Sequence, residues 1–475
     1  MAAQRPARTA GQACLRCRAH KRKCDKLQPR CSLCKRLHQI CEYEQSAPSA
    51  SPSSEIDNAL TPHGLKLSIV QRLSDLEPRA IASTYSRAIL PWFAFISESN
   101  LHSRLRQTWS DASVDLTLLA FVIALFDESP RQSEQCCSFR PDTMSMYLSS
   151  KSWLALLEGA GLNSIDLVNA RLLITLFEVV HGLYPAAYLS VASTIRAADA
   201  LYVYGSQGSS LTRSSDLLDK REVENGAELW RGIMVLDRYL AVEHGKWPPV
   251  TRGRTVPRCR VAFDGRNPEP AFSPLHSAFE ASSHLDHAHT AIHEPTPQQS
   301  FNAEEAELIV MTLNSFKTVL EQQTAGSSKL SSTGLVLANT HDADPGSGLL
   351  LILERGSRAS GTDSERNRCR VESTAGLATL IEDMMKLFTG PEENTAAIDV
   401  QTTSPFTLYL TYKIAAIVTV RLQSGLDPES SLRRVRILRR TLKLMSRRWL
   451  AAERYLRLLD EDTTPRMLKL IEHDD

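Results

Sequence analysis

The chain of 475 residues is too long for one ordinary hydrophobic core and fits a small module joined to a larger body. Its 42% hydrophobic and 23% charged residues exclude a mostly disordered chain. The net charge of +1 conceals a basic segment, because residues 14–41 hold nine Lys and Arg residues against Asp25 alone. That segment carries +8 and the remainder −7, which predicts a polyanionic partner.

The sequence shows no signal for secretion or for a membrane. The segment from Met1 to Gly11 is polar, contains arginine and lacks the apolar region of a secretory signal, so we expect the chain to stay inside the cell. The most apolar run, Leu116–Phe126, is too short to span a bilayer, so no membrane partner is expected. Because disulfides are rare in a reducing compartment, a dense group of cysteines is better explained by a metal.

Six of the ten cysteines lie in the first 41 residues and repeat one spacing. They follow the pattern C-x2-C-x6-C twice, at Cys14, Cys17, Cys24, Cys31, Cys34 and Cys41. A C-x2-C pair can place two thiolates on one zinc ion, with Zn–S distances of about 2.3 Å. Three thiolates in each repeat are one fewer than a tetrahedral zinc needs, but two adjacent ions can share two of the six sulfurs. The spacing therefore predicts two Zn²⁺ ions.

Two other metal sites explain the cysteines less completely. A zinc ribbon or a RING-like site would use the two C-x2-C pairs and leave Cys24 and Cys41 without a metal. A ferredoxin-type cluster would need C-x2-C-x2-C spacing, which the segment lacks. Neither alternative accounts for all six thiols.

The pattern resembles the fungal Zn2Cys6 binuclear-cluster family, whose motif is C-x2-C-x6-C, a variable loop, then C-x2-C-x6-8-C. The resemblance covers every cysteine of the segment, and Pro29 matches the loop proline of the family. It implies that Cys14 and Cys31 bridge the two zinc ions. The remaining ligands implied are Cys17 and Cys24 for one zinc and Cys34 and Cys41 for the other.

A basic segment follows the second cysteine, with the sequence Arg18, Ala19, His20, Lys21, Arg22, Lys23. These good helix formers predict about two helical turns, the first of which can enter a major groove. There, Lys or Arg can donate to guanine O6 and N7, while other cations contact phosphates. The alternatives are a solvated helix face or a nuclear-import signal, and Lys21–Lys23 can serve both import and DNA binding.

The family resemblance assigns roles within this basic segment. It implies that Lys21 contacts the bases of a CGG-type triplet in double-stranded DNA, and that Arg18 and Lys23 face phosphates. His20 stands where the family often has Arg or Lys, and Arg22 where an apolar residue is common. We therefore predict a DNA-binding domain over residues 1–44 with these five residues as candidate contacts.

Residues 45–79 are predicted to form a flexible linker with a short coiled coil. Residues 45–54 are rich in Ser, Ala and Pro and have no apolar period. Leu65, Ile69, Leu73 and Leu76 could begin a dimerising coiled coil, but Pro78 stops it after less than two heptads. Whether the chain forms a homodimer through this element or not is left open by the sequence.

Residues 80–475 are predicted to form an α-helical regulatory domain, so the fold class is all-α. One predicted helix opens with a capping box of Asn302 and Glu305. Another has Ser404 at its N-cap and Gly425 beyond its end. Mobile insertions are expected near residues 262–300 and 326–368. A continuous C-terminal helix is predicted from an apolar seam, interpreted as a core face rather than a dimer zipper: Val435, Leu438, Leu442, Met445, Trp449, Ala452, Leu456 and Leu459.

Two passages of the body resemble the helical regulatory region of the same family. They are residues 187–201 and residues 230–249, the second similar to the family's WW…LDRYLS…GRPP stretch. In this chain Arg231 or Gly232 replaces the second tryptophan, and Trp247 replaces the usual neighbour of the prolines.

Other candidates for chemistry are weak. The histidines of the 276–293 segment show no ligand spacing and fit a solvated loop, and the cysteines outside the cluster fit buried or incidental thiols. The residues in question are His276, His284, His287, His289, His293, Cys136, Cys137, Cys259 and Cys369. Because no P-loop, nucleophile elbow or H-E-x-x-H pattern occurs, we do not expect an enzyme.

The sequence therefore favours a nuclear, zinc-dependent, sequence-specific regulator of transcription that works with co-regulators or the transcription machinery. By the resemblance it would act on RNA polymerase II genes, for example those of a metabolic or secondary-metabolite pathway. The alternative is an enzyme or scaffold whose zinc-stabilised N-terminal module contacts other proteins.

Overall fold

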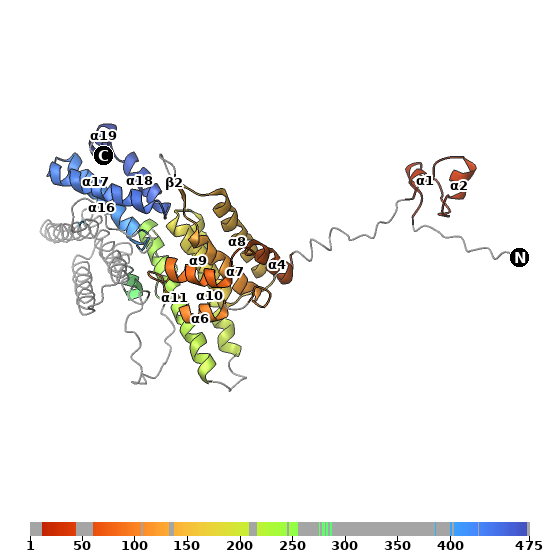
Figure 1. Cartoon of the computed structure of the whole chain (residues 1–475), viewed down its shortest axis with the longest axis horizontal. Coiled ribbons are helices and arrows are strands. Elements are labelled where there is room, and N and C mark those ends of the chain that lie inside the picture. Colours follow the sequence, from red (N-terminus) through yellow and green to blue (C-terminus); the bar gives the residue numbers. More distant parts are fainter. Residues whose placement is uncertain are drawn as a thin grey trace, which may run out of the picture. The chain divides into compact units, whose positions relative to one another are not determined.

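The computed structural model describes residues 12–43, 60–105, 108–132, 137–208, 216–244, 247–254, 403–425 and 427–472, with isolated positions between 275 and 286 and at 385 and 400. These residues form two compact units, Met1–Thr61 and Pro62–Asp475, shown in Figure 1. Within them the structure is helical apart from one short ribbon of β1 (Arg131–Gln132) and β2 (Cys137–Ser138). The predicted all-α class is confirmed.

The first unit contains two short helices, α1 (Leu15–Ala19) and α2 (Ser32–Arg36). Its buried side chains are cysteines: Cys14, Cys17, Cys31 and Cys34 are each at most 2% exposed. Cys24, Leu33, Cys41 and Tyr43 pack around them. A module with so little apolar material needs another source of stability, which a structural metal can supply.

The second unit is a layered helical body. Among the described residues its helices are α4 (Pro62–Arg72), α5 (Pro78–Ala88), α6 (Glu98–Arg104), α7 (Val114–Ala124), a 3-10 turn η1 (Leu125–Asp127), α8 (Pro141–Gly159), α9 (Ile165–Val180), α10 (Ala186–Gly208), α11 (Asp216–His244), α16 (Thr407–Gln423), α17 (Pro428–Met445), α18 (Ala451–Glu461) and α19 (Pro465–Glu472). The apolar run 116–126 lies within α7 and η1, and every one of its residues is buried. Nearly all side chains of α9 are buried as well. These two helices form the centre, and α4, α5, α8 and α10 pack around them.

The C-terminal helices α16–α19 gather at one end of this unit in Figure 1. Aromatic side chains connect them to the N-terminal part of the body. The Trp92 ring centroid lies 5.8 Å from that of Trp449 and 6.0 Å from that of Phe406, both edge to face. Edge-to-face pairs of this kind add about 0.5–1.5 kcal/mol each beyond the burial of their area.

The expected coiled coil is instead part of the body. The second unit begins at Pro62, inside the predicted linker of residues 45–79. Leu65, Ile69 and Leu73 are at most 3% exposed. Helix α4, which holds the first two of them, packs against α7 and α8. A short apolar stripe fits a neighbouring helix of the same chain as well as a partner chain, so the pattern alone could not distinguish them. The seam is therefore engaged within the fold.

The C-terminal seam is buried apart from the half-buried Leu456, as the core interpretation predicted, but its helix is not continuous. Val435, Leu438, Leu442 and Met445 belong to α17, and Trp449 lies in a turn before α18. The two helices pack against each other. The Ser446 hydroxyl donates to the carbonyl of Lys443 at 2.9 Å, a local bond that competes with helix continuation.

The helix predicted from Ser404 begins later than expected. The Ser404 hydroxyl accepts a hydrogen bond from the Phe406 N–H at 3.3 Å, but residues 405–406 form a turn and α16 starts at Thr407. Gly425 follows its end with φ +70, as a residue beyond a helix end often does. The helix predicted from Asn302, most of the predicted insertions and the 45–54 linker lie outside the described residues.

The 230–249 passage lies largely in α11 and connects it to the following loop. The Asp237 carboxylate accepts the Thr251 N–H at 2.6 Å, and the Arg238 guanidinium donates to the hydroxyls of Ser282 and Ser283 at 2.9 Å each. Burial raises the pKa of Asp237. In this passage the polar LDRY residues hold neighbouring segments against the helix.

Gly232 explains the departure from the WW pattern. A Cβ atom placed there would lie 3.0 Å from Leu172 Cδ2, 3.3 Å from Phe93 Cζ and 3.4 Å from Phe95 Cβ. These distances leave no room for a tryptophan without repacking. The glycine allows α11 to approach the core closely, while the indole of Trp230 is almost fully buried beside it.

Candidate metal centre and nucleic-acid interface

The six thiols of the N-terminal unit form two overlapping groups of four. The first group is Cys14, Cys17, Cys24 and Cys31, and the second is Cys14, Cys31, Cys34 and Cys41. Within each group all Sγ atoms lie within 4.8 Å of one another. Cys14 and Cys31 are the two thiols common to both groups.

The sulfur separations fit tetrahedral zinc. With Zn–S distances of about 2.3 Å, two sulfurs on one zinc lie about 3.8 Å apart. The Sγ atom of Cys14 is 3.8 Å from that of Cys31, 3.7 Å from that of Cys34 and 4.0 Å from that of Cys24. The donor set is thiolate only, as expected for a structural zinc site. The residues present therefore fit a pair of zinc ions.

Burial makes simultaneous ionisation of these thiols costly in the absence of a cation. It raises the pKa of Cys17 to about 12, and it also raises the pKa values of Cys31 and Cys34. Burial acts in the same direction on Cys14, but hydrogen bonds from the Cys17 backbone and from neighbouring thiols outweigh it and lower the Cys14 pKa to about 6. Divalent cations would supply the positive charge that such a packed group of thiolates needs.

The first helix ends at a turn centred on Lys21. The Lys21 N–H donates to the Arg18 carbonyl at 3.1 Å, and the Arg22 N–H donates to the Cys17 carbonyl at 2.8 Å. Lys21 has φ 48, so this is a Schellman motif with a lysine where glycine is usual. The predicted two-turn helix over residues 18–23 is wrong, because α1 ends at Ala19 and the chain turns back so that Cys24 can reach Cys14.

The second half of the module repeats this turn. The His38 N–H donates to the Lys35 carbonyl at 3.3 Å, the Gln39 N–H donates to the Cys34 carbonyl at 3.0 Å, and His38 also has φ 48. The duplication seen in the cysteine spacing is therefore a duplication of backbone conformation. Lys21 and His38 occupy equivalent positions, four residues after the second cysteine of each repeat.

Two residues that the sequence interpretation missed hold the module closed. Both carboxylate oxygens of Asp25 accept the N–H of Ser32, at 3.1 and 3.0 Å. Hydrogen bonding from the Ser32 side chain, and then from its backbone, lowers the Asp25 pKa. The Tyr43 hydroxyl donates to the Leu27 carbonyl at 2.8 Å. The sequence could have pointed to Asp25, because it is the lone acid in a segment of nine cations. No sequence feature pointed to Tyr43.

Residues 12–50 match the family model of the fungal Zn(2)-Cys(6) binuclear cluster domain. The N-terminal module belongs to this family. Domains of this kind hold two zinc ions, in agreement with the six clustered thiols.

Two curated relatives are similar over short stretches. The chain is 30% identical over 110 residues to Transcription factor BOA15 of Botryotinia fuckeliana (strain B05.10), which covers 23% of this chain and 58% of that protein. It is 50% identical over 50 residues to Uncharacterized transcriptional regulatory protein YLL054C of Saccharomyces cerevisiae, or 10% of this chain and 6% of that one. The chain thus spans less than two thirds of the length of either relative.

All nine lysines and arginines between the first and last ligand candidates of the zinc-cluster domain are exposed. Arg18 lies in α1, where its guanidinium donates to the Gln12 side chain at 3.4 Å, and His20 is the residue that follows this helix. Lys21 is at the turn, and Arg22 and Lys23 follow it in the irregular segment before Cys24. The structure therefore presents these five side chains to solvent from one short segment.

The weak candidates of the body remain without a described site. Each of the five histidines of residues 276–293, together with Cys136, Cys259 and Cys369, lies outside the described residues. Cys137 is half-buried, and its Sγ lies 3.5 Å from the Ser446 hydroxyl oxygen. Among the described residues no helix is both long and apolar enough to cross a membrane.

Proposed function

We propose that this chain is a zinc-dependent, sequence-specific DNA-binding regulator of transcription that works in the nucleus. The observation that carries the proposal is the pairing of six clustered thiols with a surface on which nine cations are all exposed. Six thiolates and two Zn²⁺ ions together carry −2, so a loaded domain retains about +6. A charge of this sign and density suits the phosphates of double-stranded DNA better than the surface of an ordinary protein partner.

For the metal, we propose that Cys14 and Cys31 bridge the two ions. Cys17 and Cys24 would complete one site, and Cys34 and Cys41 the other, which follows the two groups of thiols that share the bridging pair. The zinc ions would fix the two turns and close the module. Replacing a bridging thiol would remove a ligand from both ions, so we expect Cys14→Ala to lower the zinc content more than Cys24→Ala. Native mass spectrometry can measure both.

For DNA, we propose that Lys21 reads bases and that Arg18 and Lys23 contact phosphates, with His20 and Arg22 beside them. Two backbone hydrogen bonds fix the turn at Lys21, so its side chain projects from a defined position. A rigid position favours base readout, whereas flexible cations on either side suffice for phosphates. A CGG-type triplet is the expected preferred site.

The experiment that tests this function is selection of preferred sequences from random DNA by the full chain, with and without a zinc chelator. Lys21→Ala should cost about 1–3 kcal/mol on the preferred site and little on random DNA. Lys23→Ala should weaken both alike and reduce the slope of log affinity against log salt by about one. Arg440→Ala, at an exposed cation of the second unit, is the control.

The proposal fails if no sequence is enriched, or if enrichment persists after the chelator has removed the metal. Equal losses on preferred and random DNA for both lysine variants would reject the reading role of Lys21 alone. A loaded module that binds no DNA would support the alternative, a zinc-stabilised module for protein contacts. For the second unit, we propose a regulatory role through co-regulators, supported by its separation as a compact helical body.

A further inference from the structure

Helix α17 carries a high density of positive charge. It contains six lysines and arginines, and Glu429 is its one acidic residue. Some of these cations serve the fold. The Arg436 guanidinium donates to two carbonyls at the end of α19, at 2.8 and 3.0 Å, and Arg439 forms an ion pair with Asp460 of α18. The cations at the end of α17 have a different environment.

Three exposed cations share one face at this end. They are Arg440 and Lys443 in α17 and Arg447 in the turn after it. Residues three and seven positions apart lie on the same side of a helix, and seven residues span about 10 Å along its axis. In the part of the chain that the structure describes, the side chains of these three residues form no hydrogen bond and no ion pair. These three residues form the cationic patch of α17.

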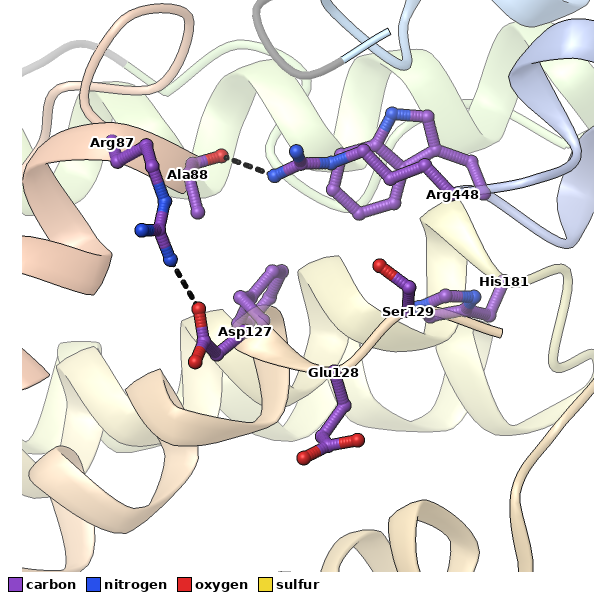
Figure 2. A pocket seen from close by; sticks show the side chains of 9 residues that line it. Arg87, Ala88, Asp127, Glu128, Ser129, His181 and Arg448 are labelled. Atoms are coloured by element: carbon purple, nitrogen blue, oxygen red, sulfur yellow. Dashed lines mark hydrogen bonds and ion pairs between the residues drawn. The ribbon is translucent and has the colours of Figure 1, made fainter. Parts of the chain in front are cut away.

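The residue next to the patch faces inward. Arg448 is 7% exposed, and its guanidinium donates to the Ala88 carbonyl at 3.3 Å, as Figure 2 shows. Arg448 is therefore part of the fold, whereas Arg447 faces solvent. The same view shows Asp127 joined to Arg87, so this acid is already paired.

The β1–β2 ribbon adds a cation beside the patch. The Sγ atom of Cys137 in β2 lies 3.5 Å from the hydroxyl oxygen of Ser446, in the turn after α17. The paired strand β1 supplies the exposed Arg131. Glu128 precedes this ribbon, but its carboxylate lies 3.5 Å from the guanidinium of Arg140. The ribbon therefore increases the positive charge of this surface, and the acid before it is directed to another cation.

An apolar side chain lies within the patch. Leu444 follows Lys443, stands four residues after Arg440 and is half-buried, so part of it meets solvent. Helix α17 packs against α16, α18 and α19, and a helix held by three neighbours does not fit the major groove, which admits a single helix. Phosphates at the surface would meet the cations and leave the leucine uncovered. Carboxylates arranged around an apolar residue would match both features.

We propose that the cationic patch of α17 binds an acidic helix of a partner protein. Carboxylates three and seven residues apart on that helix would have the axial spacing of the patch, and an apolar residue between them would lie on Leu444. Docking through one helix face is a common mode of peptide recognition. The proposal rests on the regulatory role proposed for the second unit and names the surface and the chemistry of the co-regulator. It does not involve the zinc-cluster domain.

The test is the fluorescence anisotropy of a labelled peptide titrated with the full zinc-loaded chain in the absence of DNA. The probe is a helical peptide of about 20 residues, in which Glu and Leu share one face and Ala fills the other. One control peptide has Gln in place of every Glu, and a second has Ser in place of every Leu. Both should bind more weakly than the probe. Binding of the probe should weaken as salt is raised, because salt screens exposed charges.

Two variants with the same change in charge locate the binding, which the cationic zinc-cluster domain could otherwise also produce. Glutamine is a good helix former, so neither variant should unfold the body. The patch variant should bind the probe about tenfold more weakly, since each exposed ion pair contributes only a few-fold. It combines Arg440→Gln, Lys443→Gln and Arg447→Gln. The control variant changes exposed cations of α4, α5 and α10 and should bind as the parent does: Arg72→Gln, Arg79→Gln and Arg196→Gln.

The proposal is supported if only the patch variant loses affinity for the probe, while all three proteins bind random duplex DNA equally. It is overturned if the parent does not bind the probe, or if the Gln peptide binds as well. Equal losses in the patch and control variants would also overturn it, because they would indicate diffuse attraction. A patch variant that loses affinity for DNA as much as for the probe would make the patch a nucleic-acid contact instead. Since the peptide is measured without DNA, none of these failures bears on the DNA-binding function of the zinc-cluster domain.

Discussion

Mild acid should destabilise the body through His181. This ring is buried, its centroid lies 4.4 Å from that of Phe177, and its pKa is lowered to about 3 against an ordinary value near 6.5. The unfolded chain therefore binds the proton more tightly than the folded one. The contribution of the neutral ring is complete above about pH 6.5 and is lost as the pH falls toward about 3. Between about pH 7.5 and pH 5 the loss amounts to roughly 2 kcal/mol.

The assay is urea unfolding followed by tryptophan fluorescence at both pH values. Residues 1–61 contain no tryptophan, so the signal reports the body. His181→Asn is the matched variant, since its amide oxygen can take the place of Nδ1 as acceptor for Leu450 and the side chain does not titrate. The cavity left by the smaller asparagine lowers the free energy of unfolding equally at both pH values, so this loss cancels when the two values are subtracted. If the variant loses as much stability between the two pH values as the parent does, His181 is not the group responsible.

Three further substitutions test the packing and the metal module. Trp449→Ala should lower the free energy of unfolding by about 3–5 kcal/mol and reduce the soluble yield, and Trp449→Phe should lower it less. The oligomeric state in sedimentation should not change. A stable variant that changes from dimer to monomer would instead place this residue in an interface. Gly232→Ala should destabilise the body by about 1–3 kcal/mol in the same urea assay. The control Gly159→Ala, where the new Cβ meets nothing within 4 Å, should not destabilise it. A Gly232→Ala variant more stable than the parent would contradict the close packing. Asp25→Asn should speed zinc transfer to a chelator because the Ser32 N–H loses its charged acceptor, and an unchanged rate would assign the closure to other bonds.

The metal site was predictable because covalent spacing limits where thiols can meet. Two C-x2-C pairs and two matching third cysteines leave few arrangements, and the structure brings all six together. The backbone around them was less predictable. Helix propensity favoured a helix through Lys21, but the need for Cys24 to return to the cluster overrides a preference of a few tenths of a kcal/mol per residue.

In the body, periodicity identified buried faces better than it identified their partners. Most of the seam from Val435 to Leu459 is core, although its predicted spacing runs across the turn at Ser446 and Tyr455 rather than Leu456 is buried beyond it. The spacing of apolar residues indicates which side chains face inward, but it does not indicate whether the backbone between them stays helical. The same reason explains Leu65 and Ile69, which pack within the chain, and no local sequence pattern assembled the segments around Arg448.

The repeated turn of the zinc-cluster domain bears on the direction in which the domain docks along a DNA site. Its two halves repeat one turn, at Lys21 and at His38, so the backbone alone offers two similar turns to a duplex. Charge breaks that equivalence, because residues 14–24 carry five lysines and arginines, whereas residues 31–41 carry two. At the corresponding turns stand Lys21 and His38. We therefore expect a single polarity of docking along an asymmetric DNA site, with the chain leaving the domain toward a fixed side of that site.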